Sequence, residues 1–267
     1  MHEDTHLLAD TVKKAAREAG ALLAKGYSGI DRVTFERKGA SDFVTHYDQS
    51  AERLIIDYIR QHFPAVGFLG EESGASPAHN SNVTVIIDPL DGTNNFLHGV
   101  PFFSVSIAVE QNNELIMGAV YHPLLDELIW AEKGQGAYLN DYRLICPSAC
   151  PLTEMLVATC LPYHGKGDCD LSIRQQAAIM PHVSGIRSPG SAALEIAYVA
   201  LGRFDAFWSQ GAKLEWWDVA AGILIAQEVG LMVTDIQGQA APSCLENSLL
   251  IAPSQSHQQL HSLLDKA

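Results

Sequence analysis

The order of the apolar segments narrows the folds open to this chain more than any other feature. Apolar residues recur at helical spacing over residues 8–23, and a second helix-like segment covers residues 42–59. Thr45 and Asp48, at the start of that second segment, match the pattern of a capping box. Strand-like segments then follow in series near residues 66–69, 83–87, 104–110, 115–121 and 128–131.

The second half of the chain has a different pattern, in which strands and helices alternate. We expect strands near residues 155–159, 204–208, 231–234 and 248–251, and helices near 172–180, 192–201, 219–229 and 255–264. Elements that are apolar on one face bury that face by stacking into layers. We therefore predict a layered α/β fold in one domain, residues 1–267, with an N-terminal half of about 1–145 and a C-terminal half of about 146–267.

One strand carries a more specific expectation. Val105, Ile107 and Val109 alternate along the segment 104–110, and alternation of this kind is typical of a strand with one covered face. We therefore predict that the other face of this strand is open to solvent.

Charge and cysteine content argue against several classes of function. The formal net charge of −14 disfavours nucleic acid or an anionic membrane as the main partner, although a bound cation can still attract an anionic substrate. The first residues lack the basic character of a secretory leader, and no apolar stretch reaches the roughly 18 residues of a membrane span. Five cysteines without paired C-x-x-C spacing indicate neither a zinc site nor a disulfide framework. We therefore expect a cytoplasmic protein that does not bind nucleic acid directly.

Acidic residues stand where predicted strands end and predicted helices begin. Each has an ordinary structural explanation when taken alone: a helix cap, a turn shaped by proline and glycine, or a solvated loop. Two aspartates three residues apart, directly after a buried strand, nevertheless repel each other unless positive charge lies between them. The residues concerned are Asp48, Glu71, Glu72, Asp88, Asp91 and Asp218.

Taken together, four of these carboxylates fit a divalent metal site. Strand ends and helix starts meet at the edge of a sheet, and Mg²⁺ prefers several oxygen ligands. A pair of metal ions about 4 Å apart needs one bridging carboxylate and others on each side, which Glu71, Asp88, Asp91 and Asp218 can supply. A helical turn opening near Thr93 would point free N–H groups at a phosphate, and the Thr93 hydroxyl can hold a water.

Two long motifs resemble the signatures of a known family. The segment "DPLDGTNNFLHGVPFFSVSIA" resembles the first signature of the inositol monophosphatase family, and "WDVAAG" resembles its second. The blocks "KGASDFVTHYDQSAE", "GEES", "KGQGAYLN" and "GIRSPGSAA" also look like family blocks. The resemblance covers about residues 8–265, which is nearly the whole chain.

This resemblance implies an αβαβα sandwich of the inositol monophosphatase and fructose bisphosphatase type. It further implies Mg²⁺-dependent hydrolysis of a small phosphomonoester without a covalent intermediate, sensitivity to lithium, and a homodimer. By position in the motifs, Glu71, Asp88 and the carbonyl of Leu90 would hold the first metal ion. The second would take Asp88, Asp91 and Asp218.

The resemblance also assigns roles around the attacking water and the substrate. Thr93, with Asp48 behind it, would polarise the water, and Glu71 counts among the catalytic residues. The N–H groups of Gly92 and Thr93 would hold phosphate oxygens. The "GIRSPGSAA" block adds substrate-binding residues, and two further side chains would support the metal ligands from behind. These are Gly190, Ser191 and Ala192 for the substrate, and Glu72 and Lys38 in support.

One departure from the family pattern leaves the substrate open. Many inositol phosphatases carry a glutamate seven residues before the aspartate of the second signature, but here that place is Gly211, with Ser209, Gln210 and Glu215 nearby. Inositol monophosphate is the leading substrate by resemblance. The alternatives are the sister activities on adenosine 3′,5′-bisphosphate, fructose 1,6-bisphosphate or histidinol phosphate. A regulatory role through protein contacts, as in some bacterial relatives, is a further alternative.

Overall fold

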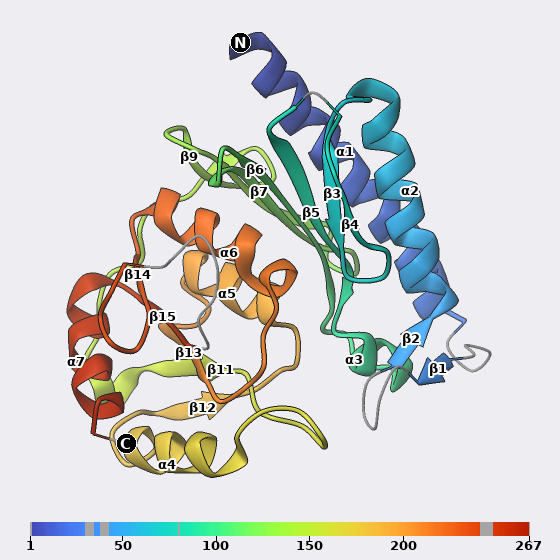
Figure 1. Cartoon of the computed structure of the whole chain (residues 1–267). Coiled ribbons are helices and arrows are strands. Elements are labelled where there is room, and N and C mark those ends of the chain that lie inside the picture. The colour runs from blue at the N-terminus through green and yellow to red at the C-terminus, as the bar shows by residue number, and fades with distance from the viewer. Residues whose placement is uncertain (1, 30–34, 38–42, 80, 241–247, 267) are drawn as a thin grey trace.

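The computed structural model describes residues 2–29, 35–37, 43–79, 81–240 and 248–266, and it arranges them in alternating layers of helices and sheets (Figure 1). One outer layer is α1 (His2–Tyr27) with α2 (His46–His62), and the middle layer is α5 (Ala192–Ala200) with α6 (Trp216–Val229). The other outer layer is α4 (Cys169–Ile179) with α7 (Ser254–Leu264). A sheet lies between each pair of helical layers, so the predicted αβαβα fold is confirmed.

Among the described residues, the larger sheet has eight strands. Within these strands only β3 (Gly67–Gly70) and β5 (Val83–Asp91) run parallel, and the other pairs are antiparallel. Its order across the sheet is β10 (Tyr142–Arg143), β9 (Gly136–Leu139), β8 (Glu127–Glu132), β7 (Glu114–His122), β6 (Ser104–Gln111), β5 (Val83–Asp91), β3 (Gly67–Gly70) and β4 (Gly74–Ser76).

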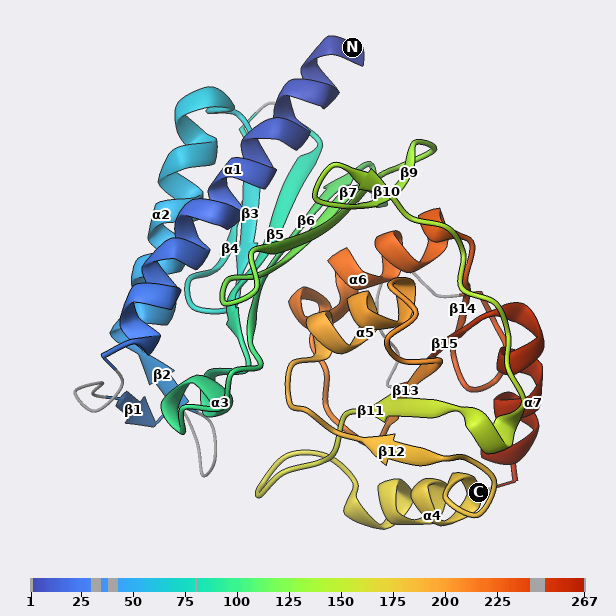
Figure 2. The ribbon, with the colours of Figure 1, turned by 180° about the vertical axis from the view of Figure 1, so that it is seen from behind.

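The smaller sheet has five strands and is built from the C-terminal part of the chain. Three neighbouring strands, β12 (Gly185–Arg187), β11 (Leu156–Thr159) and β13 (Ala206–Gln210), run parallel to one another. The strand β15 (Ser248–Ala252) is antiparallel to both of its neighbours. The order is β12 (Gly185–Arg187), β11 (Leu156–Thr159), β13 (Ala206–Gln210), β15 (Ser248–Ala252) and β14 (Met232–Thr234). Two short strands, β1 (Phe35–Arg37) and β2 (Phe43–Thr45), pair near the short helix α3 (Thr93–Leu97), as seen from behind in Figure 2.

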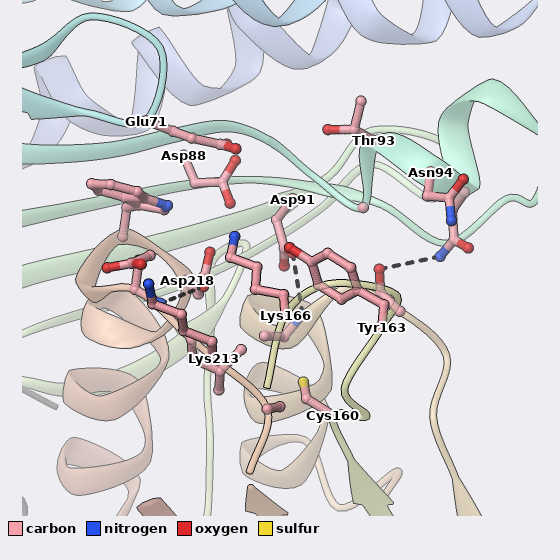
Figure 3. A pocket seen from close by; sticks show the side chains of 18 of the residues that line it. Glu71, Asp88, Asp91, Thr93, Asn94, Cys160, Tyr163, Lys166, Lys213 and Asp218 are labelled. Carbon is pink, nitrogen blue, oxygen red and sulfur yellow. Dashed lines mark hydrogen bonds between the residues drawn. The ribbon is translucent and has the colours of Figure 1, made fainter. Parts of the chain in front are cut away.

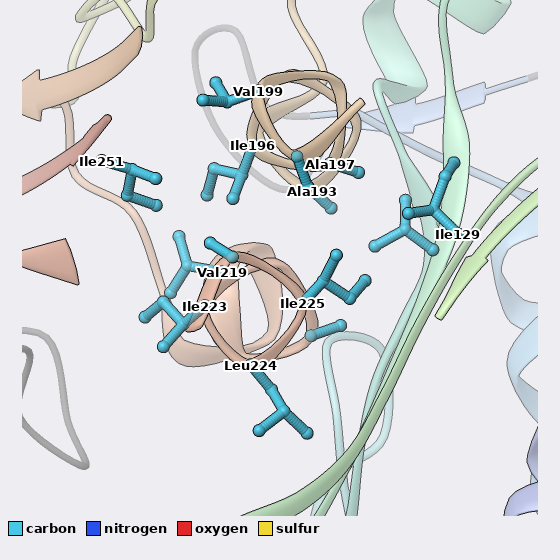
Figure 4. Close-up of a cluster of buried hydrophobic side chains, with 14 of the residues drawn as sticks. Ile129, Ala193, Ile196, Ala197, Val199, Val219, Ile223, Leu224, Ile225 and Ile251 are labelled. Carbon is cyan, nitrogen blue, oxygen red and sulfur yellow. The ribbon is translucent and has the colours of Figure 1, made fainter. Parts of the chain in front are cut away.

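The middle helices are packed from both sides, as Figure 4 shows for the side chains around them. Ile129 of the larger sheet and Ile251 of the smaller sheet belong to one buried cluster with Ile196 and Ile225. Complete burial of such a side chain stabilises the fold by about 1.5–3 kcal/mol. The contact of α6 with the sheet is close, because a Cβ at Gly118 of β7 would lie 2.7 Å from the carbonyl oxygen of Ala221.

Both faces of β6 are buried, so the prediction of an open face is wrong. Val105, Ile107 and Val109 face the cluster formed with α1 and α2. Ala108, between them, belongs to the cluster around α5 and α6. The alternation seen in the sequence therefore separates large apolar side chains from the small side chains of Ser104, Ser106 and Ala108, and helices cover both sides of this strand.

The remaining elements agree with the sequence for the long segments and differ for the short ones. Helix α1 continues beyond the apolar repeat of residues 8–23, through Gly26 to Tyr27, and a Cβ at Gly26 would lie 2.5 Å from the ring of Tyr47. The pairs β1–β2 and β9–β10, with β4 and β12, are two to four residues long and show no periodicity from which to predict them. Within the described chain, none of the helices combines the length and apolarity that crossing a bilayer requires.

Candidate active site

The acidic residues predicted to bind metal line a single pocket between the larger sheet and the start of the middle helices (Figure 3). Its volume is about 410 Å³. Glu71 follows β3, Asp88 and Asp91 lie on β5, and Asp218 lies in the first turn of α6. The structure therefore brings these four residues together around one space.

A bulge in β5 lets both aspartates reach this pocket. Side chains three residues apart on a regular strand point to opposite faces of the sheet. Asp88 pairs with Ser106 of β6 and Asp91 with Ser104, so three steps along β5 match two steps along β6. The extra residue turns the strand locally, as bulges do. The N–H of Leu90 then donates to Asp88 Oδ1 over 3.0 Å.

Asp91 is held by the beginning of α5. The Ser191 hydroxyl donates to its Oδ2 over 2.6 Å, and the N–H groups of Ala192 and Ala193 donate over 3.2 and 2.8 Å. Burial raises the pKa of Asp91 to about 6, while these hydrogen bonds oppose the rise. Ser191 and Ala192, predicted to bind substrate, thus contact a predicted metal ligand directly.

Thr93 and Asp48 form the predicted pair. Thr93 Oγ1 lies 2.9 Å from Asp48 Oδ1 and 3.0 Å from the carbonyl oxygen of Leu90, and both can accept its hydrogen. The other oxygen of Asp48 accepts the N–H of Thr45 over 2.8 Å, which completes the capping box of α2. Asp48 therefore serves as helix cap and as acceptor for Thr93. Burial raises the pKa of Asp48, and the hydrogen bonds from Thr45 and Thr93 oppose this.

Gly92 and Gly190 meet where the two parts of the chain touch. Gly92 has φ +101°, and a Cβ there would lie 3.2 Å from the carbonyl oxygen of Gly190. Asn95 Nδ2 donates to the carbonyl oxygens of Phe102 and Pro189, each over 2.7 Å, and so ties α3 to the turn that carries Gly190. Sequence reasoning missed Asn95, although it stands inside the first motif.

The sequence reading of Asp218 as a possible N-cap is wrong in one respect. Helix α6 begins at Trp216, so Glu215 is the cap residue and Asp218 is the third residue of the helix. The carboxylate of Asp218 accepts the N–H of Glu215 over 2.7 Å. Removal of this carboxyl from water raises its pKa well above the usual value, and repulsion from Asp91 adds to the rise.

The carboxylates carry an excess of negative charge that a cation would relieve. Burial raises the pKa of Asp88 well above its usual value, and repulsion from Glu71, Asp91 and Asp218 raises it further. Among the described residues, no three His, Cys, Asp or Glu side chains already form a metal-binding cluster, and Asp91 and Asp218 are turned to hydrogen-bond donors. The donor set itself, carboxylates with the Leu90 carbonyl, consists of the hard oxygen ligands that suit Mg²⁺.

The residues predicted to support the metal ligands, and the place of the family's glutamate, lie outside the pocket lining or outside the described residues. Glu72 is not among the described residues that line the pocket, and its N–H donates to Glu52 over 2.9 Å. Lys38 lies outside the described residues. Gly211, at the place of the family's glutamate, has φ +89°, and a Cβ there would lie 2.8 Å from the carbonyl oxygen of Asp168. The pocket wall is formed instead by residues 212–215, which belong to the segment noted around Gly211, and by Cys160 and Lys166, to which sequence reasoning gave no role.

Comparison with known proteins gives consistent results along the whole chain. The model of the inositol monophosphatase family matches residues 4–267. The inositol-1-monophosphatase of Mesorhizobium japonicum is 39% identical over 245 residues, which are 92% of this chain and 91% of that protein. The Nus factor SuhB of Escherichia coli is 42% identical over 233 residues, 87% of this chain and 86% of that protein.

Solved structures agree with these sequence matches. The crystal structure of the extragenic suppressor protein suhB from Bartonella henselae has a TM-score of 0.92 and 37% identity, covering 97% of this chain and 98% of that one. An inositol monophosphatase from Thermotoga maritima has a TM-score of 0.85 and 34% identity, with 96% of each chain covered.

Proposed function

The chain belongs to the inositol monophosphatase family, and from this premise we propose that it hydrolyses small phosphomonoesters with Mg²⁺, inositol monophosphate being the leading substrate. The observation that carries the proposal is the gathering of Glu71, Asp88, Asp91 and Asp218 in one pocket with the Thr93–Asp48 pair. We further propose that the protein is cytoplasmic, homodimeric and sensitive to lithium, in keeping with its family.

The carboxylates supply the ligands that the reaction needs. Glu71, Asp88 and the Leu90 carbonyl would hold one Mg²⁺, and Asp88, Asp91 and Asp218 a second. Bound Mg²⁺ neutralises developing charge and lowers the pKa of water. The Leu90 carbonyl oxygen has a second lone pair beside the one directed at Thr93, so both contacts are compatible.

Thr93 would orient the attacking water. Its hydroxyl can donate to the buried Asp48, which leaves the oxygen of the hydroxyl ready to accept a hydrogen bond from water. Asp48 is fixed by Thr45 of the capping box, so the hydroxyl is held in one direction. The N–H groups of Gly92 and Thr93, at the rim of the pocket, would hold oxygens of the phosphate.

The choice of substrate depends on the opposite wall. Ala212, Lys213, Leu214 and Glu215 line it, and no glutamate stands at Gly211. Inositol monophosphate leads because relatives of similar length are named inositol-1-monophosphatase. The bisphosphate and histidinol phosphate activities remain the alternatives within the same chemistry.

A second candidate function is a regulatory role through protein contacts. The observation that favours it is the 42% identity to a protein named Nus factor SuhB. The two roles use different parts of the molecule, because hydrolysis requires the pocket and a protein contact requires the surface.

A panel of phosphomonoesters, offered to the purified protein with Mg²⁺, tests the proposed function. We expect turnover of inositol 1-phosphate to exceed that of adenosine 3′,5′-bisphosphate, fructose 1,6-bisphosphate and histidinol phosphate. A different first substrate would change the assignment within the phosphatases. Absence of turnover on every ester would contradict the enzyme and favour the binding role.

A further inference from the structure

A lysine from the C-terminal half enters the carboxylate pocket on a closed turn. The N–H of Tyr163 donates to the carbonyl of Lys166 over 3.2 Å, and the N–H of Lys166 donates back over 2.9 Å. These two hydrogen bonds close the turn over residues 163–166. The hydrogen bonds of this turn therefore hold the backbone of Lys166 in place.

The segment that follows fixes this turn against the pocket wall. Gly167 has φ +94°, and a Cβ there would lie 2.3 Å from the carbonyl oxygen of Gly211. That carbonyl accepts the N–H of Asp168 over 2.7 Å. The turn therefore packs against Gly211, in the segment that precedes α6. Asp218 lies in the first turn of that helix.

The side chain of Lys166 extends toward the predicted metal ligands. Figure 3 shows its ammonium group pointing at the carboxylates of Asp88, Asp91 and Asp218. Burial raises the pKa of Asp218 well above its usual value, and the charge of Lys166 opposes part of this rise. Lys166 is half-buried, and a lysine loses rotational freedom when it is held in one place.

The location of the lysine relative to Thr93 indicates which part of a substrate it meets. In Figure 3, Thr93 lies on one side of Asp91, and the Lys166 ammonium lies on the other side with Asp218. In an in-line displacement the attacking and leaving oxygens occupy opposite sides of phosphorus. A water oriented by Thr93 therefore expels the leaving group toward Asp218 and Lys166.

We propose that Lys166 is a further catalytic residue, whose ammonium group contacts the ester oxygen of the substrate and stabilises the negative charge that forms there. The inference rests on the phosphatase function proposed above. The oxygen of water forms a bond to phosphorus, the bond from phosphorus to the ester oxygen breaks, and its electron pair stays on the ester oxygen. The water loses a proton and the ester oxygen gains one from solvent, so the products are inorganic phosphate and an alcohol.

A fixed positive charge at this oxygen accelerates cleavage more strongly when the leaving group is more basic. An alkoxide accumulates much more charge on the ester oxygen than 4-nitrophenolate, which spreads its charge over the ring. A lysine that only balances the carboxylates would affect all esters alike, because its effect would not depend on the leaving group. The leaving group therefore separates the two roles.

The test compares Lys166→Met and Lys166→Arg with wild type on 4-nitrophenyl phosphate, phenyl phosphate and inositol 1-phosphate at saturating Mg²⁺. We expect Lys166→Met to lower kcat for inositol 1-phosphate by about a hundredfold and for 4-nitrophenyl phosphate by less than about threefold. Lys166→Arg should restore part of the loss, since it keeps the charge. Lys133→Met is the matched control, because Lys133 is exposed, pairs with Glu114 at the start of β7, and does not line the pocket.

Three outcomes would overturn the inference. A uniform fall on all three esters would make Lys166 a structural residue, and unchanged rates would leave it outside the reaction. A rise in rate, with half-saturation at lower Mg²⁺, would mean that the lysine competes with the cation. Melting curves of each variant establish that it is folded. Failure of wild type to hydrolyse any of the esters would instead contradict the proposed function.

Discussion

The carboxylate side of the pocket and the opposite wall are held in place in different ways. Asp88 and Asp48 are buried, and each is fixed by hydrogen bonds inside a long strand or helix. The wall formed by residues 212–215, Cys160 and Lys166 is joined to turns at Gly167, Gly190 and Gly211, which all have positive φ, and most of its side chains are partly exposed. The side with the predicted metal ligands is therefore held by burial and by hydrogen bonds within long elements, whereas the wall can change with few consequences for the core.

Removal of the metal should have the largest effect, because it disables the whole carboxylate side. We expect an excess of chelator to lower the rate at least about a thousandfold, since metal ions contribute several kcal/mol to such reactions. Activity should return with Mg²⁺ on the order of millimolar, and Ca²⁺ should inhibit through its looser coordination. The measurement is phosphate release against metal concentration. Full activity in chelator would refute the metal mechanism.

Asp218→Asn tests the predicted metal ligand at the start of α6. An asparagine oxygen can still accept the N–H of Glu215, so the start of α6 should be preserved and thermal stability without metal should be close to normal. Loss of the negative charge should weaken Mg²⁺ binding and lower kcat by about a hundredfold or more. Kinetics and melting curves on both proteins check this. A folded variant with normal kcat would mean that Asp218 serves only to stabilise the start of α6.

A matched pair of threonines separates catalysis from capping on the carboxylate side. Thr93→Ala should lower kcat by about tenfold to a hundredfold through a misplaced water, with little change in melting temperature. Thr45→Ala removes the N-cap of α2 and should lower the free energy of unfolding by about 1 kcal/mol. Its effect on kcat should be the smaller of the two. The opposite pattern would show that Thr93 serves stability.

The smallest effect should come from Glu195, which supports the wall. Its Oε1 accepts the N–H of Gly190 over 2.9 Å, and burial raises its pKa from 4.5 to about 8. Because the folded state binds the proton more tightly, stability should fall as pH rises from about 4.5 to 8.

Glu195→Gln should remove this contribution and raise the melting temperature of the metal-free protein at pH 8 by a few degrees, with no gain at pH 4. Glu127→Gln is a suitable control, since its carboxylate pairs with Arg203 and does not line the pocket. Melting curves between pH 4 and 8 measure both. A gain that is the same at every pH would show that the charge of Glu195 is not the cause.

The two sides of the pocket also differ in how far the sequence predicts them. The carboxylates, the capping box of Thr45 and Asp48, and the long helices and strands carry local patterns that identify them. The bulge that brings Asp88 and Asp91 to the same side depends on pairing with β6, which no local pattern encodes. Lys166 reaches the pocket through a turn that packs against Gly211. This contact depends on the packing of segments that are distant in the sequence.

The hydrogen bonds from the start of α5 to Asp91 have a consequence for folding while the chain is being synthesised. Asp91 is emerging while its partners Ser191, Ala192 and Ala193 lie 100 to 102 residues further along the chain. Contacts between such distant residues form late, because a long loop must first close. The nascent chain thus carries its acidic residues through most of synthesis without a finished site. The pocket can be completed only after residues 191–193 and Asp218 have been made, so a chain that ends before them would lack these contacts.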